Sequence, residues 1–288
     1  MTDRIPALQL QGISKSFGAV RALDSVDFEA YAGEVVCLVG DNGAGKSTLI
    51  KVISGTYRAD SGEYRCGGKA VTITRPRDAT DLGIETVYQD LALCDNLDVV
   101  ANLFLGREWL GAQASSKDDA EKRRDAPIFR TLWPLDEIAM EKKAVSVLAG
   151  LDVRLPSVRR PVATLSGGQR QSVAISRAVM WNSRVVLLDE PTAALGVAQT
   201  RQVLDLIKRL RERGLAVVLI SHNLADVFEV ADRIIVLRLG RRVATFQASK
   251  SSPQEVVAAI TGASMGGKTT GGKTADDKTA DDKTEEVQ

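Results

Sequence analysis

Apolar and polar residues alternate near the start of the chain in the way that half-buried strands require. Leu8 and Leu10 flank one polar residue, and Val26 and Phe28 flank another. Side chains two residues apart share one face of a strand. The alternation therefore predicts antiparallel strands between positions 8 and 28, each with one face toward a core.

Nearly continuous apolar runs farther along the chain predict strands that are buried on both faces, as in a parallel sheet. A helical pattern over 198–213 separates two of these runs, and it places Val203, Leu204, Ile207 and Leu210 on one stripe. Strands that alternate with helices predict an α/β fold with a mostly parallel sheet. The four runs are 34–39, 84–88, 184–188 and 215–220.

The middle and the end of the chain depart from this alternation. Residues from about 95 to 161 show helical patterns around the charged run SSKDDAEKRRD at 115–125. They predict a helical subdomain, at about 91–180, inserted in the α/β core. The charged run is interpreted as a solvated loop, with a partner-specific role as the alternative. Residues 265–288 repeat Lys, Thr and Asp without apolar periodicity. They are expected to be disordered, so that the folded domain spans 1–264.

Composition and charge narrow the possible classes of protein. The 288 residues, 44% of them hydrophobic, suffice for one large domain with a sizeable core. The net charge of +1 gives no indication of nucleic-acid binding. Cys37, Cys66 and Cys94 show no CxxC spacing, which favours free cytosolic thiols over a metal site or disulfides. The chain shows neither a secretory signal nor an apolar run of roughly 18 residues, so a role at a membrane is expected to need a partner.

The stretch GDNGAGKST has the pattern GxxxxGK[ST] of a phosphate-binding loop. It follows the predicted strand 34–39 and opens a predicted helix with Leu49, Ile50 and Ile53 on one face, which is the context that the pattern needs. Glycines let backbone N–H groups turn toward phosphate oxygens, and the helix start adds positive potential. Lys46 is expected to bind the β- and γ-phosphates and Ser47 to bind Mg²⁺. The loop comprises Gly40, Asp41, Asn42, Gly43, Ala44, Gly45, Lys46, Ser47 and Thr48.

Two adjacent carboxylates end the apolar run 184–188. Neighbouring side chains on a strand point to opposite faces, which predicts different tasks for Asp189 and Glu190. A nucleotide in a phosphate loop needs a second magnesium contact and a group that activates water. Asp189 is the candidate for the metal, and Glu190 is the candidate for orienting or deprotonating the attacking water.

A second predicted anion-binding loop has the sequence LSGGQRQ. It opens a predicted helix that ends near Met180. Backbone N–H groups of Ser166, Gly167 and Gly168 stand at this helix start. One nucleotide does not need both loops. The simplest resolution is that this loop, from Ser166 to Gln169, caps the γ-phosphate of a nucleotide held by another subunit. Two chains would then bury two ATP molecules with two-fold symmetry.

These motifs, in their order, resemble the ATP-binding subunits of ABC transporters over nearly the whole chain before the tail. The set is GDNGAGKST, YQD, LSGGQ, LLDEP and SHN. The resemblance implies a P-loop NTPase core with an antiparallel β subdomain and an inserted helical subdomain, and it implies ATP and Mg²⁺ as ligands. It also implies that Gln89 touches magnesium and communicates with a membrane partner, that His222 contacts the γ-phosphate, and that Phe17 stacks on adenine.

Longer stretches are similar to one class of that family, the bacterial importers of simple sugars, which includes fructose and ribose systems. These stretches are YQDLALCDNLDVVANLFLG, EPTAALG and SHNLADVFEVADRIIVLRLGRRV. Many members carry two cassettes, whereas this chain has one phosphate loop and one LSGGQ. The resemblance implies a homodimer or a pair with another ATPase chain at the cytoplasmic face of a bacterial membrane. The expected partners are a multi-span permease, contacted around 89–102, and a periplasmic or lipid-anchored sugar-binding protein.

Gly196 departs from the pattern of the family, where the loop after EPT usually ends in an aspartate. Glycine cannot make the contact of that side chain across a dimer, but it permits a positive φ and a close approach of two backbones. The turn is therefore expected to act through its backbone. Hydrolysis is expected to persist, because Asp189 and Glu190 are present.

Three other functions compete with transport. A soluble ABC ATPase that acts on ribosomes or DNA would carry two cassettes or long coiled coils, and the chain shows no sustained heptads. A P-loop kinase would leave LSGGQ and SHN unexplained. A protein that uses ATP only as a conformational ligand would not need Glu190 and His222.

Overall fold

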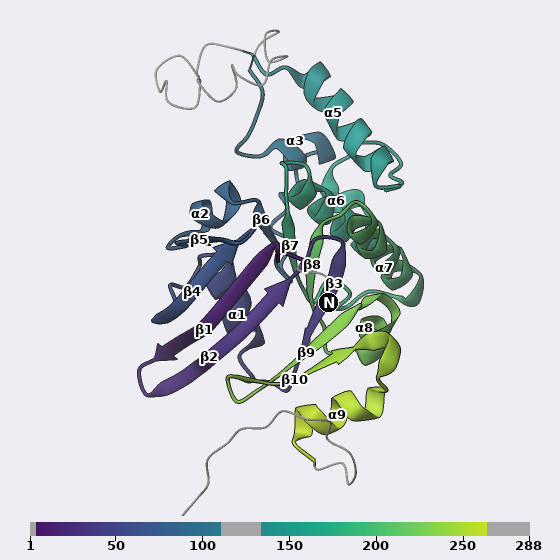
Figure 1. The fold of residues 1–288 in the computed structure, drawn as a ribbon. Coiled ribbons are helices and arrows are strands. Elements are labelled where there is room, and N and C mark those ends of the chain that lie inside the picture. Colours follow the sequence, from purple (N-terminus) through teal and green to yellow (C-terminus); the bar gives the residue numbers. More distant parts are fainter. Residues whose placement is uncertain (1–3, 111–133, 264–288) are drawn as a thin grey trace, which may run out of the picture.

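The computed structural model describes residues 4–110 and 134–263 (Figure 1). The charged run at 115–125 and the tail at 265–288 lie outside the described residues. The expected division of 1–264 into a core and a helical subdomain stays a prediction.

The central layer is a six-stranded sheet in the order β10-β9-β3-β8-β7-β6. Five of its strands are parallel, and β10 is antiparallel to β9. The four predicted apolar runs are strands of this sheet, and each predicted end lies within one residue of the observed end. This agreement confirms the α/β prediction. The strands are β3 (Glu34–Val39), β6 (Ile84–Val87), β7 (Val185–Asp189), β8 (Ala216–Ile220), β9 (Arg233–Arg238) and β10 (Arg241–Gln247).

A second, antiparallel sheet has the order β2-β1-β4-β5 and confirms the alternating pattern at the start of the chain. Leu8 pairs with Ala30 and Leu10 with Phe28, and all four side chains are buried. This sheet lies on one side of the central sheet (Figure 1). Its strands are β1 (Leu8–Phe17), β2 (Val20–Ala30), β4 (Ser61–Cys66) and β5 (Lys69–Val71).

The two faces of the central sheet bury different elements, as the period of two along a strand requires. On β3, Val36 and Leu38 belong to a hydrophobic cluster shared with the antiparallel sheet and with α1 (Lys46–Ile53). Val35 and Cys37 belong to the cluster on the other face, which is shared with four further helices. These helices are α6 (Gly167–Val179), α7 (Val197–Glu212), α8 (Leu224–Val230) and α9 (Pro253–Thr261).

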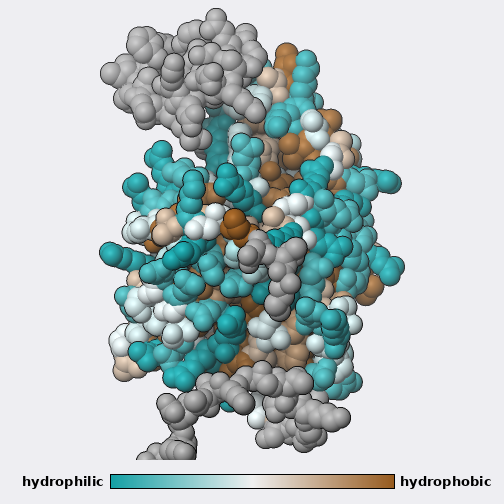
Figure 2. Space-filling model, viewed as in Figure 1, coloured by the Kyte–Doolittle hydropathy of each residue, from teal (hydrophilic) through white to brown (hydrophobic). Residues whose placement is uncertain are grey.

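A third cluster joins α3 (Val99–Phe104), α5 (Glu137–Gly150) and the outer side of α6. Phe104 is fully buried there, with the Trp109 and Trp181 rings at 5.1 and 5.5 Å. Ile138 and Val145 of α5 are exposed, and apolar surface appears at this upper part of the molecule in Figure 2. The short helix α2 (Pro76–Asp81) lies beside β6. No helix among the described residues is long and apolar enough to cross a bilayer.

Candidate nucleotide site

The glycine-rich loop is held between two strands that come from distant parts of the chain. Gly40 has φ 155° and Gly45 has φ 101°, conformations that side chains rarely adopt. A Cβ on Gly40 would collide with the backbone oxygen of Leu237, and one on Gly45 would lie 2.7 Å from the backbone oxygen of Ala22. The backbone N–H of Gly240 also donates to the carbonyl of Ala44 at 3.1 Å. The sequence therefore needs glycine at both positions to pack the loop against β2 and β9.

Lys46 is the first residue of α1 and folds back over this loop. Its Nζ donates to the backbone carbonyls of Gly40 at 2.8 Å and Asp41 at 2.9 Å. Burial lowers the pKa of Lys46, and the charges of Glu190, Asp41 and Asp189 oppose that shift. The ammonium therefore lies inside the concave face of the loop, where a phosphate group needs a positive charge. Thr48 is half-buried, whereas Ser47, Asn42 and Gly43 are exposed.

The two adjacent carboxylates lie at the carboxyl end of β7, in different environments. Asp189 pairs with Ile220 of β8, and burial together with the charge of Glu190 raises its pKa. Glu190 has left the strand: its φ is 49°, and its N–H donates to the carbonyl of Ile220 at 3.0 Å. A left-handed backbone at a non-glycine residue is strained and is concentrated at functional sites. Glu190 therefore does not continue the extended backbone of β7.

His222 reaches the same place from the next strand. It follows β8 by two residues, and its Nδ1 lies 3.3 Å from Oε1 of Glu190. The His222 side chain is 70% exposed and that of Glu190 is 25% exposed, so the pair faces solvent at the edge of the sheet. Lys46, Asp189, Glu190 and His222 are thus brought together by β3, β7 and β8.

Gln89 and Phe17, two further predicted site residues, are both exposed. Gln89 is exposed in the loop after β6, whose Val87 pairs with Leu188, so the loop begins level with Asp189. Phe17 ends β1 with its ring 43% exposed and 5.1 Å from the ring of Tyr57. One part of the aromatic surface of Phe17 therefore remains accessible to a flat ligand.

Ser166 and Gln169 form a reciprocal cap at the start of α6. The N–H of Gln169 donates to Oγ of Ser166 at 3.3 Å, and the N–H of Ser166 donates to Oε1 of Gln169 at 3.0 Å. These two side chains fix the start of the helix and leave the backbone of Gly167 and Gly168 at its tip. Because α1 and α6 pack on opposite faces of the central sheet, the two anion-binding loops belong to different sides of one chain.

Gly196 does not use the positive φ that glycine permits, whereas the expected close approach of two backbones stays a prediction. Gly196 has φ −73° and ψ 162°, and a Cβ there would meet nothing within 4 Å. It is the N-cap of α7, without a side chain to cap it. The positive φ values in this turn belong instead to Glu190 and to Ala194, at 60°.

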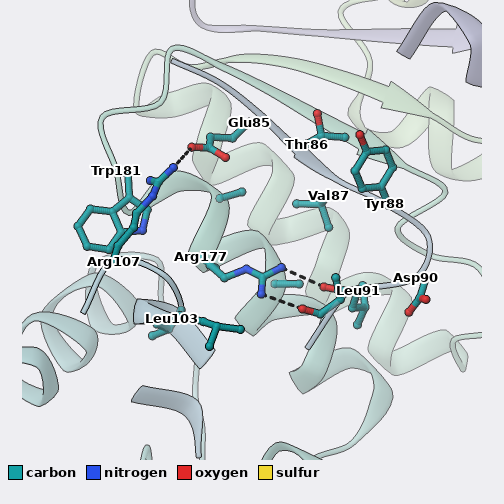
Figure 3. A pocket seen from close by; sticks show the side chains of 14 residues that line it. Glu85, Thr86, Val87, Tyr88, Asp90, Leu91, Leu103, Arg107, Arg177 and Trp181 are labelled. Carbon is teal, nitrogen blue, oxygen red and sulfur yellow. Dashed lines mark hydrogen bonds and ion pairs between the residues drawn. The ribbon is translucent and has the colours of Figure 1, made fainter. Parts of the chain in front are cut away.

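A groove near Gln89 contains charged residues that the sequence motifs do not indicate (Figure 3). The cavity, of about 170 Å³, lies between β6, the end of α3 and the end of α6. Arg177 of α6 donates to the carbonyls of Leu91 at 3.1 Å and Ala92 at 2.9 Å. Arg107 pairs with Glu85 at 3.1 Å and lies over the ring of Trp181 at 5.2 Å. Burial raises the pKa of Glu85 and lowers that of Arg177, and only the fold brings these residues together.

Residues 23–193 match the family model described as ABC transporter. The chain belongs to the ABC transporter family. Its fold is that of an ATP-binding cassette: a nucleotide-free cassette of an ABC transporter superposes with a TM-score of 0.72 at 28% identity, covering 88% of this chain and 98% of the other. A cassette solved in its ADP conformation superposes with a TM-score of 0.71 at 27% identity, over 89% and 95% of the two chains. The chain is thus a cassette of a family that binds ATP and ADP.

Curated relatives of this ABC cassette are similar over most of its length. The fructose import ATP-binding protein FrcA of Rhizobium meliloti is 46% identical over 90% of this chain and 95% of its own. The xylose/arabinose import ATP-binding protein XylG of Sulfolobus acidocaldarius is 42% identical over the same shares. The ribose import ATP-binding protein RbsA of Yersinia pestis is 36% identical over 90% of this chain but 47% of its own. The cassette therefore covers almost the full length of the first two relatives and about half the length of the third.

Proposed function

We propose that this ABC cassette is the ATP-hydrolysing subunit that powers import of a monosaccharide through a membrane permease. The observation that carries the proposal is the meeting of Lys46, Asp189, Glu190 and His222 at one edge of the sheet. Relatives named as fructose and xylose/arabinose import ATP-binding proteins, each covered to 95%, support the class of substrate.

Lys46 and the loop around it bind the phosphates. The ammonium, held by the carbonyls of Gly40 and Asp41, neutralises charge on the β- and γ-phosphates, and loop N–H groups and the start of α1 add donors. Phe17 offers the exposed part of its ring to the adenine base. Catalysis then depends mainly on position and charge neutralisation, as expected for phosphoryl transfer.

Mg²⁺ fits the oxygen-bearing residues of the site. Ser47, Gln89 and Asp189 would hold it, and hard oxygen ligands suit this cation. The raised pKa of Asp189 shows that burial makes its negative charge unfavourable, which a divalent cation would offset. When bound, the metal neutralises phosphate oxygens.

Glu190 orients the attacking water and accepts its proton. Its left-handed backbone and its hydrogen bond to Ile220 hold the carboxylate at the sheet edge, beside His222. His222, 3.3 Å away, fixes the orientation of that carboxylate and contacts the γ-phosphate. The arrangement is that of a base oriented by a neighbouring group.

Two chains close over two ATP molecules in this proposal, most simply as a homodimer. The tip of α6 lies on the face of the sheet opposite to α1, so the loop at 166–169 is free to complete the site of a second copy. A cassette that is 25% identical, with a TM-score of 0.64 over 84% of this chain, was solved as a dimer bound to ADP and Pi. Closure and release of the dimer drive the permease between its two access states.

The groove of Figure 3 is the proposed contact with the permease. It adjoins the loop of Gln89, it is concave, and it combines the charged side chains of Glu85, Arg107 and Arg177 with Leu103 and Trp181. A short amphipathic helix on a cytoplasmic loop of the permease would fit it. The cassette would then sit on the cytoplasmic face of a bacterial membrane, and a sugar-binding protein would deliver substrate from the other side.

Uptake of labelled sugars in a deletion strain tests the proposal. We expect loss of uptake of one of fructose, xylose, arabinose or ribose, restored by the wild-type chain and not by Glu190→Gln. Unchanged uptake of all four, with ATP hydrolysis intact in the purified chain, would instead favour the alternative of a soluble ABC ATPase outside transport.

A further inference from the structure

The starts of α6 and α7 are in unusually close contact. A Cβ placed on Gly168 would lie 2.9 Å from Cβ and 3.2 Å from Cγ of Gln199, and one on Gly167 would lie 3.1 Å from Cδ2 of Leu195. Real Cβ atoms essentially never come within 3.0 Å of another heavy atom. Glycine at 168 is therefore required by a residue of its own chain, independently of any bound nucleotide.

Gln199 also braces the turn from which α7 starts. Its Oε1 accepts from the N–H of Gly196 at 3.4 Å, and Gly196 has no side chain with which to cap the helix in return. A cavity of about 390 Å³, lined by Ser166, Gln169 and Gln202 among others, lies beside Gln199. One side of Gln199 thus touches the glycine tip of α6, while the neighbouring space is open.

The segment between Glu190 and Gln199 is ordered by short-range hydrogen bonds. The N–H of Ala193 donates to the carbonyl of Glu190 at 3.1 Å, and the N–H of Leu195 donates to that of Thr192 at 3.3 Å. Oγ1 of Thr192 donates to the buried carboxylate of Asp226 at 2.7 Å. These bonds connect Glu190 with the turn that precedes Gln199, and Thr192 anchors that turn to Asp226 of α8.

We propose that Gln199 is a positioning residue that sets the orientation of the 166–169 loop and mechanically links that loop to Glu190 of the same chain. The inference rests on the proposed function. In the proposed dimer, Glu190 acts on the nucleotide of its own chain, and the 166–169 loop acts on that of the partner. Gln199 then joins the two sites through packing, at a turn where Gly196 supplies no side chain.

A double-substitution experiment on the full chain tests this role. Gly168→Ala should lower ATP turnover about tenfold through overpacking against Gln199. Adding Gln199→Gly removes both Cβ and Cγ of residue 199. We therefore expect the turnover of the double variant Gly168→Ala/Gln199→Gly to lie within about threefold of the turnover of Gln199→Gly alone. Gln199→Glu, which keeps Cβ, Cγ and an acceptor oxygen, should retain nearly full turnover.

Gln202→Gly provides the matched control, because Gln202 lines the same cavity and lies on the same helix but is not among the atoms nearest to Gly168. Gly168→Ala/Gln202→Gly should stay impaired. We would also measure MgATP-dependent dimerisation by size-exclusion chromatography, on a Glu190→Gln background and well below the unfolding temperature. The variants should rank in the same order by dimerisation as by turnover. A purely structural role would move the unfolding temperature but not this dimerisation.

Either of two results would overturn the inference. If Gln199→Gly does not rescue Gly168→Ala, the nucleotide or the partner chain excludes a side chain at position 168. If Gln202→Gly rescues Gly168→Ala equally well, the contact with Gln199 is not what matters. Failure of the ATP-bound dimer, the part of the proposed function on which the inference rests, looks different. The wild-type chain would then neither hydrolyse ATP nor dimerise with MgATP, while the loss and rescue would still appear in the unfolding temperature.

Discussion

At the scale of single residues, the site depends on a strained backbone at Glu190. Its φ of 49° takes the chain out of β7 directly after Asp189, so that the two neighbouring carboxylates differ in backbone conformation. The hydrogen bond from Glu190 N–H to Ile220 and the nearby His222 hold this conformation. Strain of this kind persists only where surrounding structure over-determines it.

Glu190→Gln should separate binding from hydrolysis. The amide has the same size but cannot accept the proton of the attacking water, so we expect turnover to fall about 100-fold or more. Nucleotide affinity should remain, and the MgATP-bound dimer should accumulate. Phosphate release and size-exclusion chromatography measure the two effects, with Glu229→Gln on α8 as a control that should resemble wild type. Undiminished turnover in Glu190→Gln would remove Glu190 from the reaction.

Asp189→Asn should stabilise the nucleotide-free protein in a pH-dependent way. Burial and the charge of Glu190 raise the pKa of Asp189 above its unfolded value, so ionisation is less favourable in the folded state. Above the folded pKa, the ionised carboxylate therefore costs stability. Below the ordinary range of an aspartate, both states are protonated and the cost vanishes. Thermal unfolding should show a higher midpoint for Asp189→Asn at pH 7 and a shrinking difference as the pH falls toward 4. A lower midpoint at pH 7 would contradict this assignment.

At the scale of elements, the helices of this cassette differ in how their starts are capped. α1 begins at Lys46 without a side-chain cap, so its first N–H groups are directed at the phosphate loop, whereas α6 and α9 begin with reciprocal caps. α6 and α9 share the Ser-x-x-Gln/Glu cap but differ in location. Ser166 caps α6 at the proposed inter-chain site, whereas Ser252 caps α9, which has no proposed role in binding.

Ser166→Ala and Ser252→Ala form a matched pair. Each removes one N-cap acceptor, at 3.3 Å from an N–H in both helices, and should cost about 1 kcal/mol of stability. Only Ser166→Ala should also reduce ATP turnover, because only that loop faces a nucleotide. Thermal unfolding and phosphate release provide the two readings. Equal turnover in the two variants would contradict a role for the 166–169 loop.

Gly196→Asp should be tolerated and slightly stabilising. The backbone at 196 is extended, a Cβ there has open space, and an aspartate would cap α7. We expect a gain of a few tenths of a kcal/mol in the free energy of unfolding, measured by denaturant titration. A loss of about 1 kcal/mol or more would mean that the turn needs glycine after all.

Periodicity predicted the strands and helices that carry long apolar patterns, such as β3, β8 and α7. It did not indicate β4 and β5, because β4 has one buried side chain, Tyr64, among polar residues and β5 has three residues. The seven residues of α8 are too few for a clear helical period. Tertiary contacts, not local pattern, maintain these elements.

At the scale of the whole molecule, the order of strands explains why the predicted site residues converge. Glu190 and His222 are distant in sequence, and they meet because β7 and β8 are neighbours with Asp189 opposite Ile220. Motifs named these residues but could not supply the distance between them. The left-handed backbone of Glu190, the extended Gly196 and the groove of Arg107 and Arg177 depend on packing and had no signal in the sequence.

Each nucleotide site is proposed to be shared between two chains, and a mixing experiment can test this sharing. Lys46→Ala removes the phosphate contact, and Ser166→Arg blocks the loop that caps the partner's nucleotide, so each variant alone should be inactive. A mixed dimer contains one intact site, formed by Lys46 of one chain and Ser166 of the other. We expect an equimolar mixture to recover up to about a quarter of wild-type turnover, since half of the dimers are mixed and each has one of two sites. Absence of recovery, with mixed dimers verified by differential tags, would contradict the shared site.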